Sequence, residues 1–171
     1  LKAPQEITHV RRLKGADATV AALVATAGSL QDRLGAVLFQ LPPNFKKDLP
    51  RLRDFLPLAS GGRVAFEFRH PSWFDDDALA LLREHRAALC LADAGDELEV
   101  PFVATADWGY LRLRRPGDGD AALAGWAGRI RGQAWQDVFV FFKHEDAAAG
   151  PRMAARLAEF LAEGAARGGA A

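Results

Sequence analysis

The feature that most constrains this fold is a repeated pattern of a short apolar run, a polar loop and a segment of helical periodicity. Several of the runs are apolar at consecutive positions, which is typical of strands that are covered on both faces. Successive runs begin 22 to 27 residues apart, which is the length of one compact βα unit. The five runs are AVLFQ (36–40), RVAFEF (63–68), ALCLAD (88–93), YLRLR (110–114) and DVFVFF (137–142).

The segments between the runs show the 3.6-residue period of amphipathic helices. Aspartate or proline stands where most of these helices are predicted to begin, as expected for capping and first-turn residues. A fourth, less regular helix is predicted around Trp126. The predicted starting residues of the other helices are Asp17, Asp48 with Pro50, Asp75 to Asp77, and Pro151.

Strand, helix and strand in alternation predict an α/β fold with parallel strands. An open doubly wound sheet and a closed barrel both fit the pattern. The chain has neither the glycine fingerprint of dinucleotide-binding folds nor a phosphate-loop signature, which favours a TIM-type (β/α) barrel. With LKAP (1–4) counted as a strand, we expect a partial barrel of about six βα units. We predict one incomplete barrel domain over residues 1–163 and a disordered tail over 164–171.

Composition limits the function classes. Lysine plus arginine equals aspartate plus glutamate, 22 against 22, so no global field attracts nucleic acid or an anionic membrane. No apolar run reaches the length of a membrane span, so no membrane partner is expected. The single cysteine, Cys90, cannot form an intrachain disulfide and suits a reducing compartment. We therefore predict a cytoplasmic location.

The chain contains separated motifs such as FQLPP (39–43), EFRHPSW (67–73) and FFKHED (141–146). Together with the other motifs given below, they resemble those of the YecE-like family, catalogued as domain of unknown function 72. The resemblance implies a TIM-type barrel, with an N-terminal portion containing two strands that this chain lacks. It implies no reaction, because the family has no established activity. Analogy between barrel folds alone suggests a metal-dependent phosphodiester hydrolase as one alternative function. The motifs are KAPQEITHVRRL (2–13), FQLPP (39–43), EFRHPSW (67–73), AD (92–93), TAD…GYLRLR (105–114) and FFKHED (141–146).

In such barrels the C-terminal strand ends form the reactive face. Glu67 and Arg69 are two residues apart, so they are predicted to point inward while Phe66 and Phe68 point to the helices. Cations outnumber carboxylates among the polar strand-end residues, which favours a small anionic or phosphorylated ligand. We predict Glu67 and Asp93 as catalytic acid–base residues. The predicted ligand-binding residues are Lys2, Gln40, Arg69, His70, Tyr110, Arg112 and Lys143.

The loop after the second run allows two interpretations. His70 precedes Pro71 and fits either an acid–base group or a turn residue bonded to backbone. Trp73 and Phe74 are expected to form a hydrophobic lid. We predict no metal site, because consecutive polar residues such as 144–146 (His, Glu and Asp) are typical of a solvated loop, and the sequence indicates no particular cofactor.

Three hypotheses about function remain open at this point. The first is an enzyme acting on a small anionic substrate. The second is a non-catalytic barrel that binds a ligand or nucleic acid, although the basic stretch RLRRPG (112–117) is too short to form a nucleic-acid patch by itself. The third is that the strand-end charges form a purely structural ion-pair network.

Overall fold

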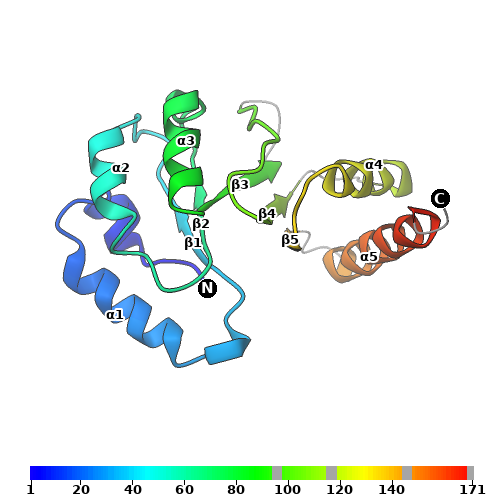
Figure 1. The fold of residues 1–171 in the computed structure, drawn as a ribbon, viewed down its shortest axis with the longest axis horizontal. Helices are drawn as coiled ribbons and strands as arrows, with labels where there is room; N and C mark the ends of the chain where they lie inside the picture. Colours follow the sequence, from blue (N-terminus) through cyan, green and yellow to red (C-terminus); the bar gives the residue numbers. More distant parts are fainter. Residues whose placement is uncertain (94–97, 115–118, 144–147, 169–171) are drawn as a thin grey trace.

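The computed structural model describes residues 1–93, 98–114, 119–143 and 148–168, with side chains described up to residue 163. Five parallel strands form one sheet in the order of the sequence (Figure 1). The predicted α/β class is confirmed. The sheet is open, with β1 and β5 at opposite ends of the strand order, so a closed barrel is not observed. The strands are β1 (Val37–Gln40), β2 (Val64–Glu67), β3 (Ala88–Asp93), β4 (Trp108–Leu113) and β5 (Asp137–Phe142).

The N-terminal segment lies beside β1 and is shorter than the predicted sixth strand. Lys2 forms a single parallel bridge with Leu38. The amide of Ala3 donates to the carbonyl of Leu38 over 2.8 Å, and the amide of Leu38 donates to the carbonyl of Leu1 over 2.9 Å. The ammonium group of Lys2 reaches the side chain of Gln40, the last residue of β1.

The described residues form five helices and three short helical turns, and α4 and α5 lie side by side at the β5 end (Figure 1). α5 continues past residue 163, where the predicted domain ends, and residues 169–171 lie outside the described chain, so the domain limits stay a prediction. The helices are α1 (Asp17–Gly28), α2 (Leu49–Phe55), α3 (Asp76–Glu84), α4 (Asp120–Arg131) and α5 (Ala149–Gly168); the turns are η1 (Glu6–Val10), η2 (Gln31–Arg33) and η3 (Pro71–Trp73).

Two of the predicted capping aspartates are confirmed. The Asp48 carboxylate accepts a hydrogen bond from the amide of Arg51, and that of Asp75 accepts one from Ala78. The prediction that Asp17 caps α1 is wrong. Ala16 occupies that position without a side-chain bond, and Asp17 is the first residue of the helix, where its charge still favours the positive end of the helix dipole.

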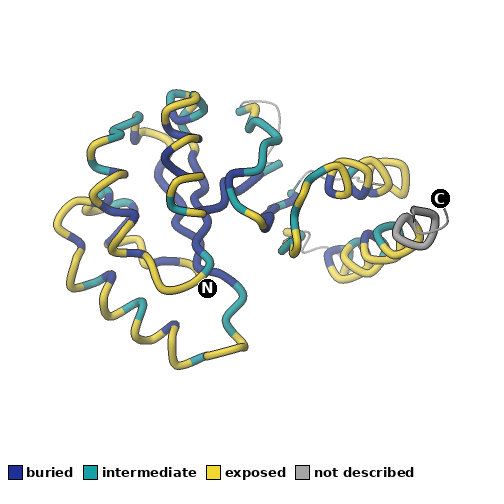
Figure 2. The backbone as a smooth tube through the Cα atoms, viewed as in Figure 1, coloured by how far each residue is buried: buried dark blue, intermediate teal, exposed yellow. Residues whose placement is uncertain are grey.

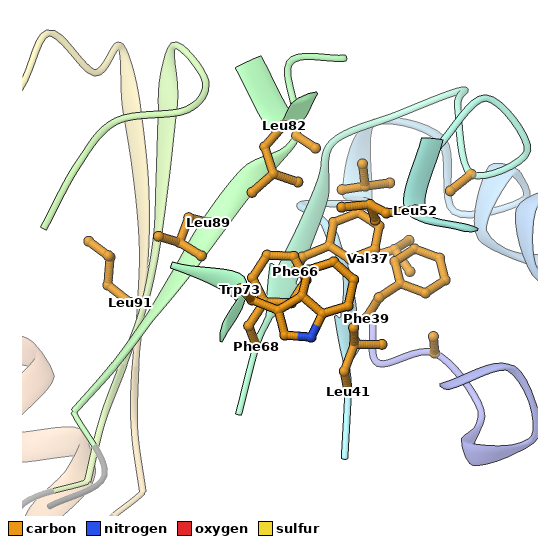
Figure 3. Close-up of a cluster of buried hydrophobic side chains, with 14 of the residues drawn as sticks. Val37, Phe39, Leu41, Leu52, Phe66, Phe68, Trp73, Leu82, Leu89 and Leu91 are labelled. Carbon is orange, nitrogen blue, oxygen red and sulfur yellow. The ribbon is translucent and has the colours of Figure 1, made fainter. Parts of the chain in front are cut away.

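The two faces of the sheet pack differently. On the helix side, Phe39 and Phe66 stack with ring centroids 5.3 Å apart and meet side chains such as Leu52 (Figure 3). The other face carries a second cluster formed by the strands and their flanking residues, in which Trp108 and Tyr110 are the large members. The outer sides of the helices are exposed (Figure 2). Among the described residues, those helices that contribute buried side chains contribute them to the helix-side core and not to the second cluster.

No helix in the described part of the chain combines the length and the apolar character needed to cross a membrane.

Removal of the Phe66 ring tests the helix-side core. The ring is fully buried between Phe39, Phe55 and Phe68, so Phe66→Ala should lower the free energy of unfolding by about 3–5 kcal/mol. Val10→Ala is the control, because Val10 is 77% exposed and its change should stay within about 0.5 kcal/mol. Urea unfolding followed by tryptophan fluorescence measures both. Equal effects of the two substitutions would contradict this assignment of the core.

Candidate functional site

A buried carboxylate stands at the end of β2. Glu67 is 2% exposed and points to the face opposite Phe66 and Phe68, as predicted. Its Oε2 is ion-paired with the guanidinium of Arg112 on β4. Its Oε1 accepts a hydrogen bond from Arg114 over 3.2 Å. The side chain thus reaches across β3 and joins the ends of two strands that are not neighbours in the sheet.

The network continues in the other direction to the N-terminal segment. The amide nitrogen of Gln40 donates to Glu67 Oε1 over 2.7 Å, and the amide oxygen of Gln40 accepts from Lys2 Nζ over 2.8 Å. The Gln40 side chain therefore connects the exposed ammonium group of Lys2 to the buried carboxylate of Glu67. Four predicted site residues, Lys2, Gln40, Glu67 and Arg112, are brought together in this way.

Arg114 belongs to the same network but is absent from the predicted ligand-binding residues. The alternation of Tyr110, Arg112 and Arg114 along one face already indicates that it points the same way. Its amide donates to the carbonyl of Asp93, and its Nε is buried with no hydrogen-bond partner in the described structure. A buried guanidinium nitrogen without an acceptor is uncommon and is an available donor.

Arg69 follows β2, which ends at Glu67, and is exposed. Among the described contacts none joins Arg69 to Glu67, and the inward direction of Arg69 stays a prediction. Arg69 instead acts on His9 in η1, where burial lowers the pKa of the imidazole and the charges of Lys2 and Arg69 lower it further. The sequence alone assigns no role to His9, because only the fold brings η1 close to these cations.

The remaining strand-end residues lie at the same edge. Asp93 ends β3 and is half-buried, while Lys143 follows β5 and is exposed. Backbone bonds from Arg114 to Asp93 and from Lys143 to Leu113 hold these ends in register. The loop residues 144–146, weighed as metal ligands, lie outside the described residues.

Tyr110 and Cys90 lie on the same face of the sheet, further from the strand ends. Burial raises the pKa of the Cys90 thiol, so the thiol stays protonated. Burial is the main cause that raises the pKa of the Tyr110 phenol to about 12, and the neighbouring Cys90 adds to the increase. Both groups are therefore neutral beneath the charged network.

His70 is a turn residue, in agreement with the structural interpretation of the His-Pro pair. Its Nδ1 accepts a hydrogen bond from the amide of Ser72 and lies 2.8 Å from the Ser72 hydroxyl. That hydroxyl also accepts from the amide of Lys47. His70 thus ties the loop after β2 to the loop after β1.

Trp73 is a core residue rather than a lid. It is fully buried, stacks on Phe68 with ring centroids 4.6 Å apart, and donates from its indole nitrogen to the carbonyl of Phe45 over 2.8 Å. Figure 3 shows the indole lying against the Phe68 ring. The motif EFRHPSW therefore contains Glu67 of the charged network. It also contains Ser72 and Trp73, whose hydrogen bonds connect the loop after β2 to the loop after β1.

Within the described ranges, no group of three His, Cys, Asp or Glu side chains is placed to hold a metal ion. The described members of the charged network are three cations, Lys2, Arg112 and Arg114, around the Glu67 carboxylate. Such an excess of donors suits an anion, and guanidinium groups bind phosphate and carboxylate oxygens in a defined plane.

Comparison with known proteins identifies a family. The model of a family described as "Protein of unknown function DUF72" matches residues 1–170. The crystal structure of a DUF72 family protein from Thermotoga maritima is 21% identical, with a TM-score of 0.74, over 93% of this chain and 70% of that one. A DUF72 family protein from Enterococcus faecalis is 15% identical, with a TM-score of 0.72, over 86% and 66% of the two chains. The TM-scores show a shared fold. No curated protein matches the sequence.

The titration of Tyr110 tests the neutral layer beneath the network. Tyr110 is the single tyrosine, so the ultraviolet absorbance of tyrosinate reports on it alone. Its midpoint should lie near pH 12 rather than 10.0. Because the folded pKa is raised, the neutral phenol contributes stability below pH 10.0 that is lost as the pH rises toward 12. Tyr110→Phe should abolish the signal, and a midpoint near 10 in folded protein would refute the burial of this ring.

Proposed function

The chain belongs to the DUF72 family, whose description specifies no reaction, and we propose that its strand-end network binds a small anionic ligand such as a phosphate ester or a carboxylate. One observation carries this proposal. Among the described residues of the network, Glu67 is the one carboxylate, and it engages both of its oxygens while three cations surround it, which gives these residues an excess of two positive charges. A ligand anion supplies the missing charge.

The cations differ in how they are held. Arg112 and Arg114 are fixed in direction by Glu67, so they lose little freedom when an anion binds. Lys2 is exposed and bound to the neutral amide of Gln40. We assign the two arginines to orientation of the ligand and Lys2 to its attraction from solvent. Arg69, His70, Tyr110 and Lys143 remain predicted ligand-binding residues.

If the bound anion is a substrate, we assign an organising role to Glu67. The Glu67 carboxylate is buried and accepts three side-chain hydrogen bonds, so both of its oxygens are engaged. Asp93 ends the strand that lies between β2 and β4 and is half-buried. It pairs in register with Leu113, which belongs to the helix-side core, so alternation directs Asp93 to the face opposite Arg112. The acid–base role of Asp93 therefore stays a prediction from the sequence.

We also propose that the open sheet is an arc of a (β/α) barrel. A doubly wound sheet reverses its strand order and carries helices on both faces. Here the order is sequential, and the second cluster is formed by strands and their flanking residues. β5 is only partly covered, and Phe141 is 48% exposed. Further strands beyond β5 would cover this edge and complete the wall of the site. A cytoplasmic location stays a prediction.

Titration calorimetry with inorganic phosphate and with succinate tests the binding proposal. Lys2→Gln and Arg112→Lys should each weaken binding about tenfold, which corresponds to one lost or misaligned charge-assisted hydrogen bond. Lys2→Gln is the cleaner variant, because Lys2 is exposed and its Nζ bonds to Gln40 alone among the described residues.

The matched control is Arg83→Gln, which removes an exposed cation from α3 and should leave affinity unchanged. Thermal unfolding of each variant separates lost binding from lost folding. Absence of binding by the unmodified protein, or equal affinity in Lys2→Gln, would favour a purely structural network. Tight, salt-sensitive binding of an oligonucleotide without binding of either small anion would favour a nucleic-acid interface instead.

A further inference from the structure

A separate basic groove lies beside the loop that joins β1 to α2. It is open to solvent, with a volume of about 650 Å³. This size is in the range of small-molecule sites. None of its lining residues belongs to the strand-end network. The polar residues that line it are Arg12, Asn44, Lys46, Lys47, Asp48 and Arg51.

One aromatic ring organises two of these cations. The guanidinium carbons of Arg12 and Arg51 lie 6.0 and 5.4 Å from the centroid of the Phe45 ring. The ring itself is buried and packs edge-on against Trp73, which also bonds to the Phe45 carbonyl. The groove thus contains Phe45, whose position is fixed by packing and a hydrogen bond with Trp73 of the His-Pro-Ser-Trp turn.

The charges in the groove are only partly balanced. Lys47 is ion-paired with Asp75, and Arg51 pairs with Asp48 over 3.1 Å. Within the described residues, no carboxylate pairs with Arg12 or Lys46, and Arg12 has only the side-chain oxygen of Asn44 at 3.4 Å. Two positive charges are therefore left for a ligand.

The backbone at Arg12 adds an independent observation. Arg12 and Leu13 both have positive φ angles, 49° and 69°, which is unfavourable for residues other than glycine. Leu13 is buried, which anchors the turn and directs Arg12 toward Phe45. Unfavourable backbone conformations that neighbouring packing maintains are concentrated at binding sites.

We propose that this groove is a second anion site and takes the phosphate groups of a small oligophosphate ligand. Two guanidinium groups on one ring present planar donors suited to phosphate oxygens, and Lys46 adds a mobile charge. The cations converge on one hollow instead of following a stripe, which fits a compact ligand better than an extended polyanion. The site is independent of the strand-end network.

Pyrophosphate titrated into the protein tests the proposal by calorimetry. The double variant Arg12→Gln/Lys46→Gln should weaken the affinity of the groove at least about tenfold. Arg53→Gln is the matched control, because Arg53 is an exposed cation of α2 outside the groove, and it should leave the affinity unchanged. Lys2→Gln, made in the same series, should leave this binding intact while affecting the strand-end site.

Retention of full affinity by the double variant would overturn the proposal, and so would an equal loss in Arg53→Gln. Loss of pyrophosphate binding in Lys2→Gln alone would assign the binding to the strand-end network. An oligonucleotide that binds more tightly than pyrophosphate, with affinity reduced by Arg53→Gln as well, would identify a polyelectrolyte surface instead. Circular dichroism of each variant excludes unfolding as the cause of a loss.

Discussion

The burial of Glu67 is the constraint on which this end of the sheet depends. A carboxylate that is 2% exposed is tolerated only when it is paired and hydrogen-bonded, because its desolvation is otherwise too costly. The pairing groups are Arg112 on β4, Arg114 just after β4, and Gln40 at the C-terminal end of β1. The parallel strand order makes this possible, since the C-terminal ends of all five strands meet at one edge.

The sequence predicted the strands well because each is buried strongly enough to leave a continuous apolar run. It predicted the face of Glu67 correctly, because alternation inside a strand places this residue opposite Phe66. The direction of Arg69 is harder to predict, because Arg69 lies beyond the end of β2. Closure of the sheet was not predictable from periodicity, since an arc and a closed barrel share the same local pattern.

Contacts between distant segments account for the rest of what the sequence did not reveal. His9 acquires its electrostatic neighbours only because the chain after Lys2 returns over the strand ends. Thr105, in the TAD motif, appears polar in sequence but is buried, where its hydroxyl accepts from Leu89 and donates to Ala87. Such a residue supports the backbone around β3, so a polar motif residue near a strand is not by itself a site residue.

Different interactions orient the arginines of the strand-end network and those of the groove. A buried carboxylate orients the arginines of the strand-end network, so their charges act at short range with little screening by salt. A neutral ring orients the arginines of the groove, where Arg51 also pairs with Asp48, and these charges lie in a hollow that is open to solvent. The segment EFRHPSW links the two, because Glu67 holds the first and Trp73 fixes Phe45 beneath the second. One short stretch of sequence therefore positions both sets of cations, although only one of its residues carries charge into either of them.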